Sequence, residues 1–376
     1  MHTNHRQIGY RPTWAEINLK NLISNFRRVR HLLAAPVKIM VTVKADAYGH
    51  GLIPVSKKLA SEKVDYLGVA SIDEGIQLRK AGIRVPILVL GVVLKEDVAP
   101  LFTYGLSTTV CSRSLAKVLN EKARALKQKI RVHIKVDTGM GRLGVLASEA
   151  FEFVKLISRR YPHLHIEGIF THFPSADTDR KFTQRQIALF GRLVKELKNA
   201  GISIPLVHAA NSMGVIGYRN SHFTMVRPGL IIYGLHPKEK IGFSVKPVLS
   251  LKSKVVFAKK VSGGYGISYG RTYITRRPTT IATLPIGYGD GYPRNLSNKA
   301  EVLLRGKKFR ISGRICMDQI MVDVGNTAIK PAEEAVLIGT QGSNRITTEE
   351  LASLSGTIPY EIVCGLGSRI PRVYIE

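Results

Sequence analysis

Cysteine is scarce in this sequence of 376 residues, which contains only Cys111, Cys316 and Cys364 and no CxxC pair. A sparse and odd set of this kind fits a reducing compartment and argues against a disulfide framework or a zinc site. Long apolar runs are missing too, since none approaches the roughly 18 residues that would cross a bilayer. The opening stretch MHTNHRQIGYRPTW has no hydrophobic segment of the kind that a secretion signal needs. We therefore expect a cytoplasmic protein with no metal site and no membrane span.

Acidic residues are the second shortage, with 27 Asp and Glu against 56 Lys and Arg, which gives a formal net charge of +29. A basic balance is compatible with binding to nucleic acid. The basic residues, however, are spread as pairs along the chain, and no aromatic residues interleave the densest run, KARALKQKIR at 122–131. Zinc-finger and RNA-binding signatures are missing as well. The charge therefore indicates a solvated basic surface, and we expect no specific nucleic-acid partner.

Short apolar runs alternate with helical patterns over the first two-thirds of the chain. The helical segments have recognisable ends, such as the one that begins after Ser71 and stops at Gly82 and another between Asp179 and Gly201. The eight apolar runs occupy residues 38–44, 65–70, 86–91, 107–110, 132–137, 166–173, 206–210 and 225–234. Continuous, unalternating strands separated by helices are typical of a parallel sheet that is buried on both faces.

Eight such strands in this length of chain favour a closed (β/α)8 barrel of the TIM type over an open sheet. The open, doubly wound alternative would place a GxGxxG turn after the first strand, and the sequence has none there. After about Phe243 the sequence changes to short β-rich segments broken by Gly and Asn, with one later helical segment that begins near Thr347. We therefore predict an α/β protein with a barrel domain at residues 1–245 and a mainly antiparallel β domain at residues 246–376.

Polar and ionisable residues follow several of the predicted barrel strands, at the end where barrel enzymes place their active sites. They are Lys44 and Tyr48; Lys135, Asp137 and Arg142; His172; Asn211 and Ser212; and Arg227 and Gly229. Each has an ordinary explanation alone, because a single strand-end lysine is usually a surface residue and a single buried histidine is usually satisfied within the core. Their joint occurrence on one rim predicts a functional site.

Two features of this rim indicate its chemistry. Barrels commonly bind phosphate with the loops after strands seven and eight, where Ser212 supplies a hydroxyl and Gly229 allows close approach of the backbone. Lys44 would lie among the cations Arg142 and Arg227, and both burial and like charge lower the pKa of an ammonium group. A neutral amine beside a phosphate site suggests a Schiff base with an aldehyde cofactor, and pyridoxal 5'-phosphate carries both the aldehyde and the phosphate.

The sequence resembles the alanine racemases, pyridoxal-phosphate enzymes of fold type III, along essentially its whole length. The blocks that carry the resemblance occur in the family's order: RPTWAEINL, VKADAYGHG, KVDTGMGRLG, THF, NSMG, VRPGLIIYG, ISYGRTY, PIGYGDGY, GRICMDQIMVDV and IPYEIVCGLGSRIPR. The complete set is highly specific, whereas one block alone would be weak evidence. The resemblance implies interconversion of L-alanine and D-alanine, which would supply D-alanine for peptidoglycan.

The resemblance also implies two catalytic bases. Lys44 would carry the cofactor and act as one base, and Tyr269, in ISYGRTY, would be the other. Tyr269 would come from the β domain of a second subunit, so the resemblance implies a homodimer with shared active sites. Racemisation needs a base on each face of the reacting carbon. A lysine amine and a tyrosine phenol both titrate near roughly 10 in water, so both must be tuned by their surroundings.

The cofactor would be held by further residues that match the family's pattern. Arg227 would donate a hydrogen bond to the pyridine nitrogen, and His172 would orient Arg227 and Tyr269. A guanidinium group cannot keep that nitrogen protonated, so the electron sink would be weaker and transamination discouraged. Arg142 would contact the phenolic oxygen of the cofactor and the carboxylate of the substrate. The phosphate would be held by Tyr48, Ser212, Gly229 and Leu230.

The resemblance assigns four supporting residues. Met317 would donate its backbone N–H to the substrate carboxylate, beside Asp318, and Tyr288 would line the access passage. Lys135 matches a position that can be carbamylated, which would give Arg142 a carboxylate-like partner.

One block departs from the family's pattern, because Ser368 stands where several members have a tyrosine that assists the phosphate and the inner passage. A broad-specificity amino-acid racemase therefore remains an alternative to an alanine racemase. A fold-type III decarboxylase is a further alternative, since those enzymes use a cysteine of the second domain. Cys316 is the candidate, but its Met-Asp neighbours and the presence of Tyr269 favour a structural cysteine. A carrier of the cofactor without catalysis would not need the roughly 130 residues after Phe243.

Overall fold

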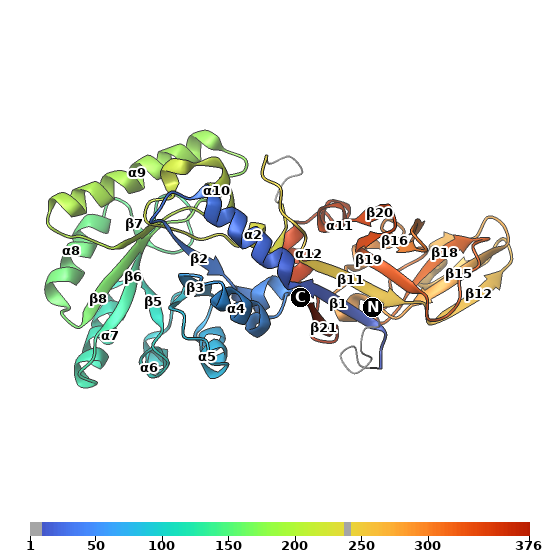
Figure 1. Cartoon of the computed structure of the whole chain (residues 1–376), viewed down its shortest axis with the longest axis horizontal. Coiled ribbons are helices and arrows are strands. Elements are labelled where there is room, and N and C mark those ends of the chain that lie inside the picture. The colour runs from blue at the N-terminus through green and yellow to red at the C-terminus, as the bar shows by residue number, and fades with distance from the viewer. Residues whose placement is uncertain (1–9, 237–241) are drawn as a thin grey trace. The chain divides into compact units, whose positions relative to one another are not determined.

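The computed structural model describes residues 10–236 and 242–376 and divides into two compact units. The barrel unit comprises residues 26–47 and 52–232, and the β unit comprises the remaining segments, 1–25, 48–51 and 233–376. Figure 1 shows the chain with its helices and strands labelled.

Eight parallel strands form the barrel unit, as the apolar runs predict. They are β2 (Lys38–Thr42), β3 (Tyr66–Val69), β4 (Ile87–Val89), β5 (Ser107–Val110), β6 (Ile130–Asp137), β8 (Leu164–Phe170), β9 (Leu206–His208) and β10 (Met225–Val226). The sheet closes because β10 pairs with β2 and β5 pairs with β6, and all these pairings are parallel. A short extra strand, β7 (Val145–Leu146), pairs with the end of β6. The predicted TIM-type barrel is therefore confirmed.

Helices follow most of the barrel strands. They are α2 (Leu19–Leu32), which precedes β2, then α3 (Lys44–Gly49), α4 (Leu52–Ser61), α5 (Ile72–Lys80), α6 (Ala99–Thr103), α7 (Arg113–Ala125), α8 (Ala150–Arg160), α9 (Arg180–Asn199) and α10 (Ser212–Gly217). Side chains of Ser71 and Asp179 accept hydrogen bonds from the backbone of the first turn of α5 and α9, which confirms both predicted starts. No helix within the described part of the chain combines the length and the apolar character needed to cross a membrane.

The eighth strand is shorter than its apolar run suggests. The run at 225–234 forms a strand only at Met225–Val226 and then a 3-10 turn, η3 (Leu230–Tyr233). Pro228 explains the difference, because proline has no N–H for the sheet and only its carbonyl joins the ladder, where it accepts from Thr42 N at 3.1 Å. The strand prediction for residues 227–234 is therefore wrong, and residues 227–232 follow β10 at the rim of the barrel unit instead.

The described residues of the β unit form three sheets, which are antiparallel except for one pair. The largest has the order β17 (Lys307–Arg310), β16 (Glu301–Leu304), β19 (Glu334–Gln341), β11 (Leu249–Lys254), β1 (Thr13–Asn18) and β21 (Arg372–Ile375), with β20 (Asn344–Ile346) beside β19. The second contains β12 (Phe257–Val261), β15 (Thr279–Leu284) and β18 (Ile320–Gly325), and the third contains β13 (Gly266–Ile267) and β14 (Tyr273–Ile274). The helices α11 (Thr348–Ser355) and α12 (Pro359–Cys364) also lie in this unit. The prediction that the second part of the chain forms a mainly antiparallel β domain is therefore confirmed.

The domain limits of 1–245 and 246–376 stay a prediction, and the most instructive difference from the two compact units lies at the start of the chain. Strand β1 pairs antiparallel with β11 and parallel with β21, so Thr13–Asn18 lies in the large sheet of the β unit. The sequence TWAEIN has Trp14, Ala15 and Ile17 buried, and this is the pattern of a strand covered on both faces. A strand far from its partners along the chain gives no local signal of which sheet it joins.

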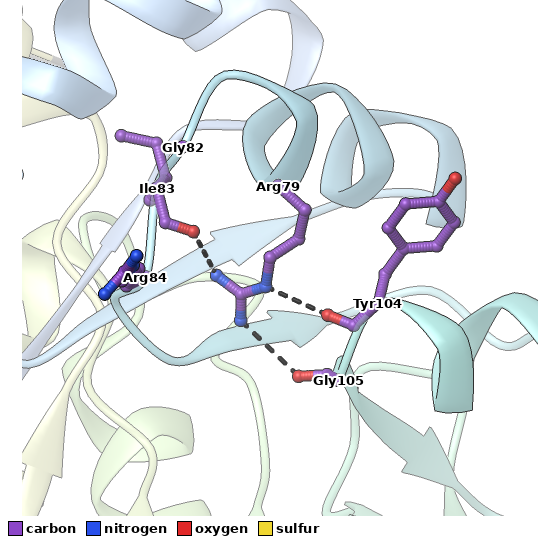
Figure 2. Close-up of a pocket in the computed structure, with 6 residues that line it drawn as sticks. All are labelled: Arg79, Gly82, Ile83, Arg84, Tyr104 and Gly105. Carbon is purple, nitrogen blue, oxygen red and sulfur yellow. Dashed lines mark hydrogen bonds between the residues drawn. The ribbon is translucent and has the colours of Figure 1, made fainter.

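Arg79 ties together two turns that enter the barrel strands β4 and β5. Its guanidinium group donates to the carbonyls of Ile83 (2.7 Å) and Val85 (2.8 Å) before β4 and of Tyr104 (3.0 Å) before β5. Figure 2 shows Arg79 between these turns, in a shallow pocket that Arg84 also lines. Because protein carbonyls occupy its donors, Arg79 is a structural residue.

We predict that Arg79→Leu lowers the free energy of unfolding by about 2 kcal/mol, because several part-buried carbonyls lose their only side-chain donor. Urea denaturation followed by circular dichroism measures the change. Arg84→Leu is the matched control, since Arg84 lines the same pocket on the exposed side and its removal should change stability by about 0.5 kcal/mol or less. Equal effects of the two substitutions would contradict the structural role of Arg79.

Candidate active site

Lys44 follows β2 and begins the short turn α3 (Lys44–Gly49), whose handedness is unusual. The four residues after Lys44, from Ala45 to Tyr48, all have φ near +53°. Non-glycine residues disfavour this left-handed conformation by about 1–2 kcal/mol each. Such backbone strain persists only where surrounding groups hold it, and it is concentrated at functional sites. The strand that ends on Lys44 is thus followed by a turn that must be held in place.

Glu74 is one of the groups that hold this turn. Its carboxylate accepts from the backbone N–H of Ala45 at 2.6 Å and from the N–H of Ala70, at the end of β3, at 2.7 Å. Glu74 lies in the first turn of α5, behind the capping Ser71, where the helix dipole also favours a carboxylate. One side chain therefore fixes the C-terminal ends of two adjacent barrel strands.

Two further hydrogen bonds stabilise the turn from within the barrel unit. The N–H of Ala47 donates to Val43 O at 2.8 Å, and the carboxylate of Asp46 accepts from Leu52 N at 2.7 Å, where α4 begins. Lys44 itself is half-buried. The backbone on both sides of Lys44 is therefore fixed, and the side chain begins from a defined point on the rim.

Arg227 lies buried behind this rim, with 5% of its side chain exposed. Its guanidinium donates to Thr171 O (2.7 Å), Ala209 O (3.1 Å), His208 Nδ1 (2.9 Å) and His172 Nδ1 (3.3 Å). Burial lowers the pKa of Arg227 to about 9, so the group stays protonated at neutral pH. Within the described residues, none of these bonds uses the Nε–H of Arg227. A buried cation with a donor to spare is thus available to a ligand.

The pKa of His172 reflects the positive charges that surround it. Burial lowers the pKa of His172 well below its ordinary value, and the cations Arg227, Lys135, Arg142 and Lys44 lower it further. The imidazole is therefore neutral at physiological pH, which is consistent with its Nδ1 accepting a hydrogen bond from Arg227. Four predicted site cations consequently lie close enough to act on one side chain, as the joint occurrence on the rim predicts.

Lys135, on β6, is the most buried of these amines, with 4% exposure. Burial, together with Arg227 and Arg142, lowers the pKa of Lys135 to about 6. Its Nζ lies 4.7 Å from the centre of the Phe170 ring and has no hydrogen-bond partner within the described residues. A buried amine without a partner is expensive, so this position is suited to chemical modification or to a ligand.

The loop after β6 carries Arg142 and is organised by Asp137. The carboxylate of Asp137 accepts from the backbone N–H groups of Gly139 (2.8 Å), Met140 (2.8 Å) and Gly141 (2.9 Å). Burial alone would raise the pKa of Asp137, but these bonds lower it overall. Asp137 is therefore occupied in shaping the loop, and Arg142 is exposed at its tip.

Ser212 and Gly229 meet, as predicted, although they come from separate strands of the barrel. Ser212 begins α10, and the side chain of the preceding Asn211 accepts from Gly214 N at 2.9 Å. The hydroxyl oxygen of Ser212 accepts from Gly229 N at 3.1 Å. Because the oxygen accepts from the backbone, its own proton is oriented for donation elsewhere. Leu230 follows directly and is buried.

Tyr48, although it is close to Lys44 in sequence, belongs to the β unit. Its ring packs against Tyr233 at 4.9 Å and Tyr360 at 5.8 Å between ring centres. Burial raises the pKa of Tyr48, and Tyr360 raises it further, so the hydroxyl remains a neutral donor. The predicted phosphate contact of Tyr48 stays a prediction.

Tyr269 lies in the β unit, in the 3-10 turn η4 (Tyr269–Arg271), with 69% of its side chain exposed. Its neighbours Ser268, Gly270 and Arg271 all have positive φ, and the Ser268 hydroxyl donates to Arg314 O at 2.6 Å. A strained and anchored loop thus presents an exposed phenol, which is unusual for a large aromatic side chain.

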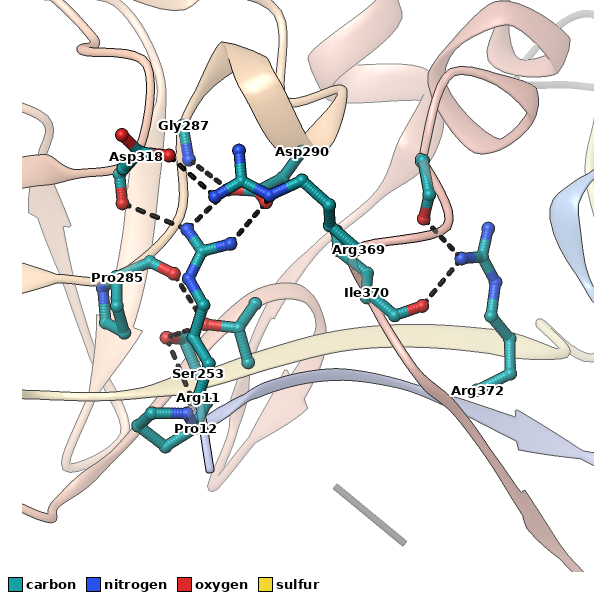
Figure 3. Close-up of polar contacts among 12 residues, drawn as sticks. Arg11, Pro12, Ser253, Pro285, Gly287, Asp290, Asp318, Arg369, Ile370 and Arg372 are labelled. Atoms are coloured by element: carbon teal, nitrogen blue, oxygen red, sulfur yellow. Dashed lines mark hydrogen bonds and ion pairs between the residues drawn. The ribbon is translucent and has the colours of Figure 1, made fainter. Parts of the chain in front are cut away.

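Met317, Asp318 and Tyr288 come together at a second place in the β unit. The N–H of Gly289, in η5 (Tyr288–Asp290), donates to Met317 O at 2.9 Å, and Tyr288 N donates to Cys316 O at 3.0 Å. Figure 3 shows how arginines secure this region. Arg369 donates to Asp318 at 2.6 Å, and both Arg11 and Arg369 pair with the fully buried Asp290. Ser368, the residue that departs from the family's pattern, is exposed.

Sequence reasoning missed several polar residues inside the barrel. Glu74 and the buried group Glu167, His133 and His208 were not predicted as site residues. The signal was weak, because His133, Glu167 and His208 are polar residues within three separate strand runs that are mainly apolar. A single polar residue of this kind is usually satisfied locally, and only the pairing of strands shows that these three meet.

The fold and the site define a barrel enzyme whose rim collects amines and guanidinium groups, joined to an antiparallel β unit. Family models described as "Alanine racemase, N-terminal domain" and "Alanine racemase, C-terminal domain" match residues 17–237 and 248–374. The chain therefore belongs to the alanine racemase family, whose members are isomerases acting on an amino acid.

Individual relatives agree with this assignment. The alanine racemase of Halothermothrix orenii is 48% identical over 368 residues, with 97% of each chain covered. The alanine racemase of Carboxydothermus hydrogenoformans is 44% identical and covers 97% of this chain and 100% of its own. Among solved structures, alanine racemase of Clostridium difficile 630 has a TM-score of 0.93 at 40% identity, covering 98% of this chain and 96% of its own. Both units are thus matched.

We predict that Glu74→Ala lowers kcat for alanine by about ten- to a hundredfold, because the turn after Lys44 loses an acceptor that fixes its backbone. Steady-state racemase kinetics measure the change. Asp73→Ala is the matched control, since Asp73 lies in the same first turn of α5 but is exposed. If both variants keep the activity of the parent, Glu74 does not hold the site.

Proposed function

We propose that the protein interconverts L-alanine and D-alanine with pyridoxal 5'-phosphate held at the rim of the barrel, and that Lys44 and Tyr269 are the two bases. The observation that carries the proposal is the buried Arg227, whose partners are carbonyls and imidazoles and whose Nε–H makes none of the hydrogen bonds found among residues 10–236 and 242–376. An uncharged pyridine nitrogen is an acceptor that suits this donor.

The residues present fit the cofactor at both of its ends. Ser212 offers a hydroxyl proton next to the backbone of Gly229, which suits a phosphate. Lys44 offers an amine at the end of β2, where the backbone is fixed, which suits an aldehyde. Bound there, pyridoxal phosphate would withdraw electrons from the α-carbon of alanine and make its proton acidic.

The two bases would act on the same carbon from opposite faces. The Nζ of Lys44 would take up or return the proton on one face, and the phenolic oxygen of Tyr269 would do so on the other. Arg227 and His172 would keep the pyridine end uncharged and oriented, since His172 is neutral and accepts from Arg227. The guanidinium of Arg142 and the backbone N–H of Met317 would hold the substrate carboxylate, with Asp318 and Tyr288 beside Met317.

The exposed side chains of the β unit support a homodimer with shared sites. Tyr269, Met317 and Tyr288 have 69%, 52% and 42% of their side chains exposed in the single chain. Catalysis of this kind takes place in a site from which water is excluded. Large side chains at catalytic positions therefore need to be covered by other protein groups. We propose that a second subunit supplies the cover, so that each site takes Lys44 from one chain and Tyr269 from the other.

Two alternative functions can be distinguished from alanine racemisation by the substrate that is used and the product that is formed. A broad-specificity racemase would use the same bases with a wider passage, which the exposed Ser368 would allow. A decarboxylase would use Cys316, but this thiol is half-buried beside Ser268 at 3.4 Å and within bonding distance of Arg314 O. The family membership favours racemisation of alanine. The D-alanine formed would serve peptidoglycan synthesis.

We predict that the purified protein with added pyridoxal phosphate converts L-alanine to an equal mixture of both enantiomers, measured by chiral chromatography. Lys44→Ala should abolish the reaction, and Tyr269→Phe should slow it by about 10²- to 10⁴-fold, because each removes one of the two bases. Racemisation of other amino acids but not of alanine would replace the proposal with the broad-specificity alternative, and release of CO2 would replace it with the decarboxylase.

Mixing the two inactive variants tests the shared site. After subunit exchange, a heterodimer of Lys44→Ala and Tyr269→Phe has one site with both bases and one site with neither. Up to about a quarter of the parent activity should return, because half of the dimers are mixed and half of their sites are complete. Activity that does not return, while exchange is shown by labelled subunits, would contradict donation of Tyr269 across an interface.

We further propose that Lys135 is carbamylated. Carbamylation joins the neutral amine to CO2 and releases one proton, and a pKa near 6 makes the amine largely neutral at physiological pH. The product would turn an unpartnered buried amine into an anion beside Arg142 and Arg227, the two cations that lower the pKa of Lys135. An unfavourable buried group would thus become a favourable one.

We predict one carbamate signal in the ¹³C NMR spectrum of the full-length protein equilibrated with ¹³C-bicarbonate at pH 8. The signal should weaken as the pH falls through about 6, since protonation of the amine competes with its reaction. Lys135→Arg should remove the signal without the loss of positive charge. Persistence of the signal in that variant would assign it to another amine, and its absence from the parent protein would reject the proposal.

A further inference from the structure

A line of polar side chains inside the barrel, three of them buried and the fourth, Glu167, half-buried, takes no part in the steps proposed above. It runs from Glu167 on β8 through His133 on β6 and His208 on β9 to Arg227. Glu167 Oε2 lies 3.2 Å from His133 Nε2, His133 Nδ1 lies 2.9 Å from His208 Nε2, and His208 Nδ1 lies 2.9 Å from Arg227 Nη1. Both histidines are fully buried. We call these four residues the barrel relay.

The donor at one end of the barrel relay and the acceptor at the other determine which nitrogen of each imidazole carries the proton. Arg227 can only donate, so Nδ1 of His208 accepts, and its remaining proton is on Nε2. That proton is donated to Nδ1 of His133, whose own proton must then be on Nε2 and is donated to Glu167. The direction from cation to carboxylate is therefore unique, as long as Glu167 is an acceptor and both imidazoles are neutral.

The carboxylate of Glu167 is held as an anion. It accepts from the Tyr66 hydroxyl at 2.5 Å and from Ser107 Oγ at 3.1 Å, and Arg131 lies 3.8 Å away. Burial would raise the pKa of Glu167, but the bonds from His133 and Tyr66 lower it to about 2. A negative charge at this end is fixed across the physiological range.

The imidazoles are held neutral by the groups around them. Burial lowers the pKa of His133, with Arg227 and Arg131 acting in the same direction and Glu167 opposing them. Burial and the cations Arg227 and Lys135 lower the pKa of His208 further, and its ring stacks on Phe170 at 4.8 Å. Neither ring therefore gains a second proton that would reverse the bond to Arg227.

We infer that Glu167 is a positioning residue for Arg227, acting through His133 and His208 from the interior of the barrel. The anion polarises His133, which makes Nδ1 of that ring a stronger acceptor for His208 and in turn strengthens the bond that the guanidinium donates to His208 Nδ1. The Nη1 group of Arg227 is fixed by that bond, so its Nε–H keeps one direction toward the ligand. The inference deepens the proposed function, and its first test does not depend on it.

The first test measures the protons directly in the full-length protein without added cofactor, by ¹⁵N NMR with labelled histidine. We expect His133 and His208, like His172, to have Nε2 protonated and Nδ1 unprotonated, with no titration between pH 6 and 8. Glu167→Gln should move the Nδ1 resonance of His208, assigned with His208→Gln, because the charge that polarises the relay is lost. A protonated Nδ1 on either ring, or no shift of His208 in Glu167→Gln, would overturn the relay whatever reaction the enzyme performs.

The second test asks whether the relay reaches the ligand, with Glu167→Gln and Tyr66→Phe as a matched pair. Glu167→Gln removes the negative charge at position 167 and keeps the shape of the side chain. Tyr66→Phe removes the hydroxyl that donates to Glu167 and leaves the charge of Glu167 in place. We expect Glu167→Gln to weaken binding of pyridoxal phosphate about tenfold, as measured by fluorescence titration. The same substitution should lower kcat about tenfold and change KM by less than twofold. Tyr66→Phe should change each quantity less than twofold.

The outcomes of the pair are distinguishable. Equal losses in both variants, in proportion to their loss of thermal stability, would make Glu167 a structural residue and overturn the inference. Failure of both variants and of the parent protein to racemise alanine would reject the proposed function but leave the NMR result standing. A shift of the cofactor's absorption band in Glu167→Gln alone would support transmission to the pyridine end.

Discussion

A guanidinium group that stays protonated at neutral pH lies buried in the barrel, and much of the polar interior follows from it. Placing a cation there is costly unless every available donor finds an acceptor. Arg227 finds carbonyls at the ends of two strands and the unprotonated nitrogens of two imidazoles. The balancing carboxylate, Glu167, is not adjacent but two rings away, so the charge is compensated without a salt bridge that would tie up the cation. The arginine is thereby held firmly and yet keeps a donor for a ligand.

The same rim shows a second constraint, in the backbone rather than in charge. The left-handed turn after Lys44 is held by two carboxylates: Glu74 on α5 accepts from the turn, and Asp46 within the turn accepts from Leu52 N at the start of α4. A right-handed continuation of β2 into a helix would send the following residues in another direction, so the turn decides where the chain leaves the barrel. The amine and the guanidinium are consequently fixed by independent networks, one of backbone bonds and one of side chains. Precision at the site comes from both.

The architecture could be predicted from the sequence because buried parallel strands appear as continuous apolar runs, and the rim residues could be predicted because they follow those runs. The prediction failed after Val226, where Pro228 ends the strand within an apolar run. Two features escaped for physical reasons. The conformation of residues 45–48 is imposed by tertiary hydrogen bonds against the local preference of Ala, Asp and Tyr, so no local pattern announces it. The relay depends on the register of β6, β8 and β9, which brings His133 next to Gly168, where no side chain competes for the space.

The placement of β1 bears on the order in which the protein takes shape during translation. The ribosome makes Thr13–Asn18 before any strand of the barrel, whereas both partners of that segment, β11 and β21, are made after all of them. The nascent chain therefore carries an apolar strand with two unpaired edges throughout synthesis of the barrel, which is the kind of segment that chaperones bind. Apart from the closing pair of β10 with β2, barrel strands pair with neighbours made shortly before them, so the barrel can assemble first. The large sheet of the β unit is completed only when β21 emerges and pairs with β1.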